Sequence, residues 1–505
     1  MKSMTDKGLG NTLLALGWGV FRAGVFVLCI AGILFYGILM LRNGMIPDFG
    51  WLLQSGAYIL AHHQIPVHDV FSWSWPDKPW VLYQWLFEVG VAWGHQNLGE
   101  QLLMRLFMVL TIACYVIAPI CLTPKRVPVL LTFLISVMGL VSASVTLTLR
   151  PLIITSVFLL AQYGFLKKYR QQQWSFAQTS ALLAILYLLW GNLHMGVTIG
   201  LGMLVLMAIG DWLEHQGLYI TESPEPLTPI KTYAVFASIG LLASCINPYG
   251  FGIYTYLFNL SSQTYLNDLI DELSSPNFHA MGFMLLLPAY LMVPFLLMRK
   301  KQVLPARDFM ILMVFNLTTL YISRFIVWLC LFASLILPRA LYDGWKNTKF
   351  SLSEAGLYRY LSLGSLVLGC LVFLAFPQFF PKVTEGECGD YKNGILSYQQ
   401  LKRPTDRLLN NDVIGSCMIR YTPQQKVFFD TRFDFYTQDF SKQVTQALVM
   451  APGWENFLHQ WKINTVLLSK TCIRVSQTCP LIHTLEAENG FKLIYEDPAM
   501  VILRN

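Results

Sequence analysis

A carboxylate that follows the first apolar run is the leading candidate for chemistry in this sequence. Asp48 lies beyond the apolar run 23–41 and heads an amphipathic segment that contains Trp51, Tyr58 and Leu60. Such a segment lies at the water interface of a membrane, where a lipid-linked substrate presents its head group. We therefore expect Asp48 to be a catalytic residue. The alternative is that Asp48 caps the helix that begins at Phe49, a position that Asp favours, and both roles can hold together.

Cationic and polar residues stand near the ends of later apolar runs. Arg150 and Arg324 each end a run, His194 follows another, and Arg105 lies about a turn inside the run 100–122. An arginine at membrane depth costs on the order of 3 kcal/mol on insertion scales, so it usually has a partner or a task. Guanidinium groups bind phosphate oxygens with paired hydrogen bonds. We expect these four residues to bind a donor phosphate; the alternative, above all for Arg105, is that they extend to lipid phosphates.

The loop that follows the apolar run 232–247 is acidic. It carries Asp268, Asp271 and Glu272 and no local Lys or Arg. Oxygen ligands of this kind bind hard divalent cations, so Asp271 and Glu272 could hold Mg²⁺ or Mn²⁺. The alternatives are a solvated acidic loop, or binding of the acceptor by Glu272 together with His279. No other cofactor is implied.

The long loop 42–99 holds further candidates for acceptor or sugar binding. Its histidines and its second aspartate could line the loop itself or contact substrate, and a metal site there is less favoured. Its tryptophans could form the aromatic belt of a membrane interface or offer apolar faces to a sugar. The candidates are Trp51, His62, His63, Asp69, Trp80, Gln84 and Glu88.

The composition indicates a membrane protein. Of the 505 residues, 55% are hydrophobic and 13% are charged, whereas soluble domains are about a quarter charged. The net charge of +7 does not indicate nucleic-acid binding, because Lys and Arg cluster in short loops between apolar runs. About eleven runs are near the length that crosses a bilayer. They are residues 23–41, 100–122, 127–148, 152–166, 175–193, 196–213, 232–247, 281–298, 308–323, 325–342 and 357–377.

Charge placement predicts the orientation of these spans. Clusters of Lys and Arg at 125–126, 167–170, 299–301 and 346–349 fall on one side, and the loop 250–280 on the other side has none. The positive side faces the cytoplasm. The first apolar run lacks a small-residue cleavage site, so we expect an uncleaved anchor with its N-terminus in the cytoplasm. The odd number of spans places the loop 42–99 and the C-terminal residues together on the outer side of the membrane.

Residues 378–505 are predicted to form a small α/β domain on the outer side. Short apolar runs at 427–429, 465–468, 492–495 and 500–503 alternate with polar, helix-like pieces such as 454–461. Four of the ten cysteines fall here, which suits two disulfides in an oxidising compartment. We favour Cys388 with Cys417 and Cys472 with Cys479. A zinc site is less favoured, because the CxxC spacing is missing.

Taken together, these motifs resemble the bacterial polytopic glycosyltransferases of the GT-C fold. These enzymes are related to the dolichyl-phosphate-mannose protein mannosyltransferases and the lipid A aminoarabinose transferases. The resemblance covers nearly the whole chain in short pieces. They include Asp48, Gly56, Ile65-Pro66, Asp69, Phe71-Ser72, Trp85-Leu86, Arg150-Pro151, Asn192-Leu193-His194, Asn247-Pro248-Tyr249-Gly250, Glu272, Ser323-Arg324-Phe325, Phe429-Asp430-Thr431-Arg432 and Gly453-Trp454.

The resemblance implies an α-helical polytopic fold in the inner membrane of a bacterium, with the loop 42–99 and residues 378–505 on the periplasmic side. It also implies transfer of a sugar from a polyprenyl-phosphate donor to an acceptor on that outer face. Asp48 would then be the base or would orient the acceptor. Many relatives have Glu before the Trp-Leu that ends the loop motif, where this chain has Gln84, and Glu88 one helical turn on could substitute. Some members carry two acidic residues at the start of the loop, so the single Asp48 leaves metal dependence open.

The residues favour the same chemistry on their own. A glycosidase needs two carboxylates, one of them to protonate a poor leaving group. A phosphate-linked sugar already has a good leaving group, so one carboxylate to take the acceptor's proton and cationic donors to the departing phosphate suffice. We therefore predict an inverting transferase whose partners are a polyprenyl-phosphate-linked sugar and the bilayer. The alternatives are a flippase of a lipid-linked saccharide and a non-catalytic subunit of an envelope-glycan assembly.

Overall fold

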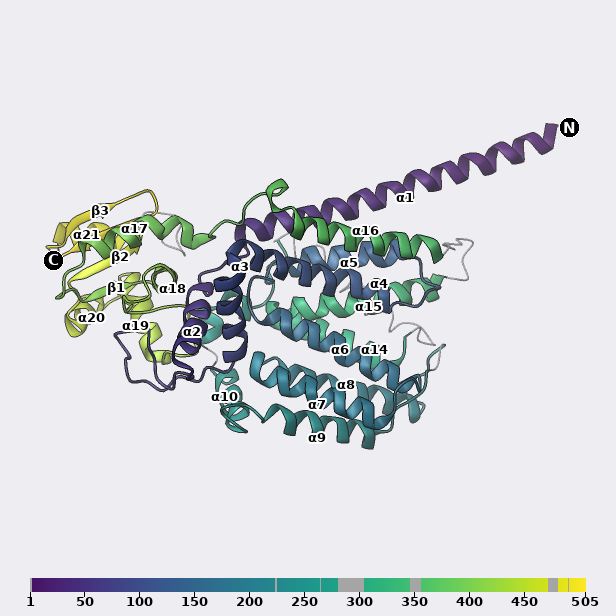
Figure 1. The fold of residues 1–505 in the computed structure, drawn as a ribbon, viewed down its shortest axis with the longest axis horizontal. Coiled ribbons are helices and arrows are strands. Elements are labelled where there is room, and N and C mark those ends of the chain that lie inside the picture. The colour runs from purple at the N-terminus through teal and green to yellow at the C-terminus, as the bar shows by residue number, and fades with distance from the viewer. Residues whose placement is uncertain are drawn as a thin grey trace.

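The computed structural model describes residues 2–222, 225–263, 265–279, 304–345, 356–470, 480–488 and 490–505. Most of the chain forms a bundle of long helices, and residues 378–505, here called the C-terminal domain, lie at one end of that bundle (Figure 1). We call this end the domain end and the opposite one the far end. The bundle comprises α1 (Lys2–Asn43), α3 (Trp85–Ile112), η1 (Ala113–Ile117), α4 (Ala118–Leu122), α5 (Val129–Ala143), α6 (Leu152–Arg170), α7 (Phe176–Leu193), α8 (Val197–His215), α9 (Ile230–Ser244), α14 (Ala306–Tyr321), α15 (Ile326–Trp345) and α16 (Gly356–Ala375).

The apolar helices of this bundle make the chain a multi-pass α-helical membrane protein. Within the described residues, five segments are long and apolar enough to cross a bilayer, and three apolar helices are shorter. Each predicted span outside residues 280–303 coincides with a helix, and the predicted span 281–298 lies outside the described residues. The five long segments are Arg22–Asn43, Trp85–Leu122, Phe176–Leu193, Val197–His215 and Ser323–Gly344.

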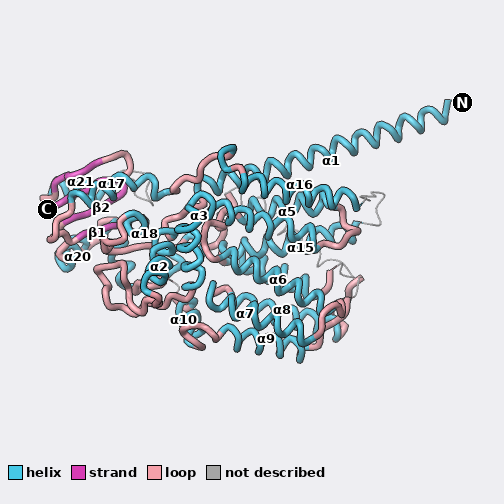
Figure 2. The backbone as a smooth tube through the Cα atoms, in the orientation of Figure 1, coloured by secondary structure: helices cyan, strands magenta, loops and turns pink. Residues whose placement is uncertain are grey.

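The predicted loop 42–99 contains a helical hairpin. Helix α2 (Phe49–His62) packs against the first part of α3, which loses helical geometry at Gly99, where φ is 76°. The two helices approach closely at Gly56, because a Cβ there would lie 2.0 Å from the carbonyl oxygen of Glu88. Residues 63–84 run between them as an irregular loop beside the C-terminal domain (Figure 2).

Short elements at the domain end connect the bundle helices. They are α10 (Gly252–Ser261), α11 (Leu266–Leu269), η2 (Asp271–Leu273), η3 (Ser323–Phe325) and η4 (Pro377–Phe379). Ser323 joins η3 to η2, since its hydroxyl donates to the carbonyl oxygen of Glu272 at 3.0 Å and its backbone N–H donates to that of Ser274 at 2.8 Å. Two turns that are far apart in the sequence are thereby held side by side.

The C-terminal domain is a four-stranded sheet with helices around it. Strand β1 pairs in parallel with β2, and β4 pairs antiparallel with both β2 and β3, which gives the order β1-β2-β4-β3. Strands β2 and β4 are buried along their whole length and form the centre of the domain. The elements are α17 (Glu387–Leu401), β1 (Leu408–Asn410), α18 (Asp412–Tyr421), α19 (Gln438–Leu448), α20 (Trp454–Trp461), β2 (Thr465–Ser469), α21 (Pro480–Glu488), β3 (Lys492–Glu496) and β4 (Met500–Arg504).

The structure confirms three of the four predicted strands and corrects the fourth. The runs 465–468, 492–495 and 500–503 lie in β2, β3 and β4. The run 427–429 is buried but forms only an isolated bridge, because the backbone of Val427 pairs with the first loop at Phe71 and Trp73 instead of with the sheet. Its place in the sheet is taken by β1, which the sequence pattern did not reveal.

A disulfide joins Cys388 of α17 to Cys417 of α18, which confirms one predicted pair. The other predicted pair cannot be placed, since Cys472 and Cys479 lie outside the described residues. The confirmed bond connects the helix that enters the C-terminal domain to α18, the helix that packs against α2.

Candidate functional site

Asp48 occupies the N-cap position of α2, but its side chain makes no capping hydrogen bond. Its Oδ2 atom lies 2.9 Å from Nη2 of Arg150. Its Oδ1 atom accepts a 2.5 Å hydrogen bond from the hydroxyl of Thr431 in the C-terminal domain. The carboxylate is therefore engaged in tertiary contacts and does not serve the helix that it precedes.

Arg150 links Asp48 to a second carboxylate. Its Nη1 atom lies 2.9 Å and 3.0 Å from the two carboxylate oxygens of Glu272. Arg324 binds the same carboxylate with Nε at 2.9 Å and Nη2 at 2.8 Å. Asp48, Arg150, Glu272 and Arg324 thus form a chain of alternating charge at the domain end, here called the ion chain.

The ion chain is half-buried and keeps cationic hydrogen-bond capacity. Its side chains are 17 to 28% exposed. Burial by itself raises the pKa of Glu272, but the charges and hydrogen bonds of Arg150 and Arg324 outweigh it, so the pKa lies below its usual 4.5. Within the described part of the chain, Nη1 of Arg324 has no partner. That nitrogen is available to an anionic group of a ligand.

The positive charge of Arg324 acts on His194. Burial and that charge lower the pKa of His194 to about 3, so the imidazole is neutral at pH 7. Its Nδ1 atom lies 2.6 Å from the hydroxyl of Thr155, which itself accepts the indole N–H of Trp190. The backbone N–H of Gly196 donates to the same Nδ1 at 3.3 Å, so Nδ1 is an acceptor, Thr155 donates to it, and the ring proton resides on Nε2. No described residue accepts a hydrogen bond from Nε2, which leaves a second free donor beside Arg324.

A group that sequence reasoning missed lies beside the ion chain. Burial raises the pKa of Tyr83 well above 10; the charges of Asp434, Glu88 and Asp48 raise it further, and the charge of Arg324 lowers it. The ring of Tyr83 packs on Tyr256 at a centroid distance of 5.9 Å, and the Tyr256 hydroxyl donates to Asp434 at 2.9 Å. Docking of the C-terminal domain brings Asp434 to Tyr256, so local spacing carried no signal for this contact.

Glu88 and Gln84, expected to contact the acceptor or sugar, lie between α2 and α3. Glu88 is fully buried, and its Oε2 accepts a 2.6 Å hydrogen bond from Ser55. Gln84 is also buried, and its backbone carbonyl oxygen accepts the backbone N–H of Glu88 at 3.2 Å. Both residues therefore support the hairpin from which Asp48 projects.

Three other expected site residues have structural partners. Arg105 donates to the carbonyl oxygens of Phe373, Pro377 and Pro381, each at 3.3 Å, and so joins α3 to the end of α16 instead of meeting a phosphate beside Asp48. Asp69 and Trp80 are buried against Arg432, with Asp69 in an ion pair and Trp80 under the guanidinium. These side chains are used within the protein, and ligand-binding roles for them stay predictions.

The remaining candidates surround the site at varied distances. Trp51 is buried and donates its indole N–H to Thr431 at 3.2 Å. His62 and His63 are exposed at the end of α2, and His279 and Asp271 are exposed in the acidic loop. Among the described residues no group of three or more His, Cys, Asp or Glu side chains is arranged to hold a metal ion. Glu272, one expected metal ligand, instead binds two arginines.

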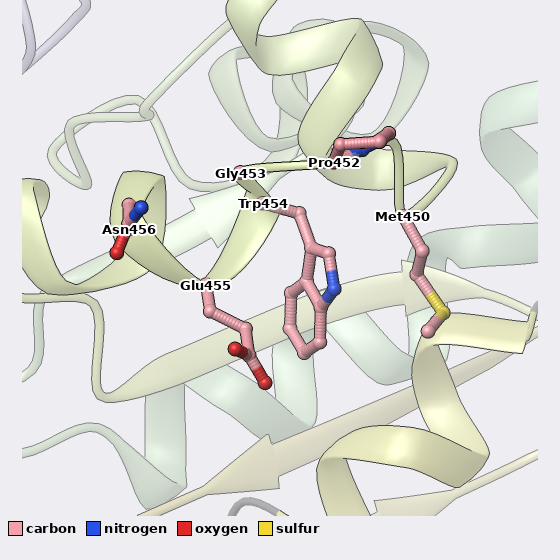
Figure 3. A pocket seen from close by; sticks show the side chains of 6 residues that line it. All are labelled: Met450, Pro452, Gly453, Trp454, Glu455 and Asn456. Carbon is pink, nitrogen blue, oxygen red and sulfur yellow. The ribbon is translucent and has the colours of Figure 1, made fainter.

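A separate hollow of about 250 Å³ lies on the C-terminal domain where α20 begins. Figure 3 shows the indole of Trp454 and the side chain of Met450 on either side of it, with Glu455 beside them. None of its lining residues belongs to the ion chain.

Comparison with known proteins places the fold. No protein-family profile matches the sequence, and no curated protein does. Solved structures match over most of the chain. The archaeal oligosaccharyltransferase AglB from Archaeoglobus fulgidus, in complex with an inhibitory peptide and a dolichol-phosphate, superposes with a TM-score of 0.51 at 9% identity, over 88% of this chain and 69% of that chain. The A. fulgidus oligosaccharyltransferase tethered to an acceptor peptide gives 0.52 at 9% identity, over 89% and 69%.

A bacterial structure agrees with these two. The arabinofuranosyltransferase AftD from Mycobacteria superposes with a TM-score of 0.50 at 13% identity and covers 96% of this chain but 40% of its own. All three are glycosyltransferases, and the fold they share with this chain is the GT-C fold that the motifs predicted.

Proposed function

We propose that this chain is a glycosyltransferase of a bacterial inner membrane that moves a sugar, with inversion, from a polyprenyl-phosphate donor to an acceptor on the periplasmic side. The observation that carries the proposal is the Asp48 carboxylate, held against Arg150 at 2.9 Å in a half-buried ion chain at the domain end. The shared fold supports it, and so does the dolichol-phosphate in the AglB structure, which is a lipid phosphate of the same chemistry.

In the proposed reaction, Asp48 takes the proton of the acceptor's nucleophilic group. That group attacks the anomeric carbon, and the bond from this carbon to the phosphate oxygen breaks. The electron pair leaves with polyprenyl phosphate, and the proton remains on Asp48. A single displacement of this kind inverts the anomeric centre, and one carboxylate suffices because phosphate needs no protonation to depart.

Two donors at the Arg324 end of the ion chain are suited to the departing phosphate. Arg324 offers its unpaired Nη1, and His194 offers Nε2–H as a neutral donor. Glu272 holds both guanidiniums in place and offsets part of their charge, which limits how tightly the product phosphate is retained. Charge-assisted hydrogen bonds to a developing oxyanion contribute to catalysis when their donors are fixed in advance.

The test compares cells that lack this chain with cells complemented by the wild type or by Asp48→Asn. Surface glycans and glycoproteins are profiled by intact mass spectrometry. We expect the wild type to restore a glycan species that Asp48→Asn fails to restore, with at least about a 100-fold loss, because Asn cannot take a proton.

The control is the abundance and melting temperature of the purified variants, since Asn preserves the size of the side chain. Normal transfer by an abundant Asp48→Asn protein would contradict the role of Asp48. If complementation with the wild-type protein restores no glycan species, the proposal that the chain is a glycosyltransferase is contradicted.

A further inference from the structure

The motif Asp430-Thr431-Arg432 in the C-terminal domain has two charged flanks that anchor it. Arg432 binds both oxygens of Asp430 at 2.8 Å and 2.7 Å and binds Asp69 of the first loop at 2.7 Å. Its guanidinium also packs over the rings of Phe71, Trp80 and Phe435, and the arginine is 1% exposed. The backbone around Thr431 is therefore fixed relative to the first loop, on which Asp48 lies.

The hydrogen bonds of Thr431 determine the direction in which its hydroxyl donates. The indole N–H of Trp51 can only donate, so Thr431 Oγ1 accepts from it at 3.2 Å. An ionised carboxylate can only accept, so the Thr431 proton points to Asp48 Oδ1 at 2.5 Å. The Ser416 hydroxyl, 2.8 Å away, then donates to Thr431. The hydroxyl of Thr431 thus accepts two hydrogen bonds, from Trp51 and Ser416, and its own proton is donated to Asp48.

We propose that Thr431 is a positioning residue for the transfer reaction, so that the C-terminal domain completes the active site by orienting the Asp48 carboxylate toward the acceptor. The inference rests on the proposed function. Thr431 and Arg150 each hold one carboxylate oxygen, which prevents rotation about the bond to the carboxyl group. Each oxygen can accept a second hydrogen bond, so a position remains for the acceptor's proton.

Two substitutions distinguish the contribution of the Thr431 hydroxyl from the contribution of the side chain's shape. Thr431→Val preserves the branched side chain and removes the donor, whereas Thr431→Ser preserves the donor and removes a methyl group. We expect Thr431→Ser to restore the glycan species in the complementation experiment and Thr431→Val to lower its formation by about 10- to 100-fold, because small misplacements of catalytic groups are that costly. Val also leaves the indole N–H of Trp51 and the hydroxyl of Ser416 without their acceptor, so the abundance and melting temperature of both variants are measured alongside the glycan. A loss of glycan that only follows a loss of folded Thr431→Val protein would overturn the positioning role.

Trp73→Phe is the matched control for a lost hydrogen bond between the first loop and the C-terminal domain. The indole of Trp73 donates to the carbonyl oxygen of Leu408 at 3.1 Å, and its ring packs on Phe428 and Trp461, away from the ion chain. We expect this variant to form the glycan at the wild-type level. If Trp73→Phe loses as much product as Thr431→Val, the effect reports domain docking and the positioning role is overturned.

The outcomes also distinguish this inference from the proposed function. Full activity of Thr431→Val overturns the positioning role of Thr431. The glycosyltransferase function is then still tested by Asp48→Asn. Full activity of Asp48→Asn overturns both, because Thr431 acts through Asp48. Loss in Thr431→Val together with activity in Thr431→Ser and Trp73→Phe supports the positioning role.

Discussion

Arg432 and Asp69 form an ion pair with an N–O distance of 2.7 Å, although their side chains are 1% and 0% exposed. The two residues lie 363 positions apart in the sequence, and their contact joins the C-terminal domain to the first loop. Both charges are compensated, because Arg432 also binds Asp430 and Asp69 also accepts from the backbone N–H of Ser72 at 2.7 Å. The pair therefore connects the two parts of the chain that supply Thr431 and Asp48.

This ion pair predicts a loss of stability in acid. Burial alone raises the pKa of Asp69, but the charge of Arg432 and the hydrogen bonds from Arg432 and Ser72 bring it below its usual 3.8. A carboxyl whose pKa is lower in the folded protein contributes stability that is complete above the unfolded value and is lost as the pH falls through the folded value. We expect the melting temperature of the purified protein to decrease below about pH 4 for this reason.

Asp69→Asn isolates this contribution. At neutral pH we expect it to lower the free energy of unfolding by about 2 kcal/mol, because it removes the charge-assisted hydrogen bond between Asp69 and Arg432 while Asp430 still pairs with that arginine. Below about pH 3.8 the difference in melting temperature between the variant and the wild type should narrow. A difference that stays constant across the titration would show that Asp69 contributes by shape and not by charge.

Arg324→Gln tests the cationic side of the site. Glutamine still donates a hydrogen bond to Glu272 but has no charge for a departing phosphate. We expect about a 100-fold loss of glycan formation, similar to the loss of one fixed donor to a developing oxyanion. Arg126→Gln is the matched control, because Arg126 pairs with Asp343 at 2.7 Å at the far end of the bundle and is 51% exposed. Equal losses in both variants would point to membrane insertion and not to the site.

Gly56→Ala tests the close packing of the hairpin that presents Asp48. A Cβ at position 56 would lie 2.0 Å from the carbonyl oxygen of Glu88, and this backbone atom cannot move without shifting α3. We expect the free energy of unfolding to fall by about 3 kcal/mol. Gly90→Ala on the exposed side of α3 meets nothing within 4 Å and should be neutral or stabilising by up to about 1 kcal/mol. Similar melting temperatures for the two variants would contradict the tight contact.

Much of the architecture follows from local sequence. The apolar runs coincide with helices, because a bilayer requires each crossing segment to satisfy its backbone hydrogen bonds internally. The pairing of Cys388 with Cys417 is confirmed. Asp48 lies 2.9 Å from Nη2 of Arg150, a residue 102 positions away in the sequence. Those residues stand at the ends of spans, so membrane topology alone gathers them on one face.

The tertiary structure decided how those residues are used. Arg105 and Asp69 carry the same charges as Arg324 and Asp48, but their partners are other parts of the protein. Thr431 and Asp434 reach the site only because the C-terminal domain docks on α2 and α10. Contacts between residues hundreds of positions apart depend on how whole domains pack. Composition and local periodicity determine which segments cross the membrane, but they do not determine which side chains then come into contact.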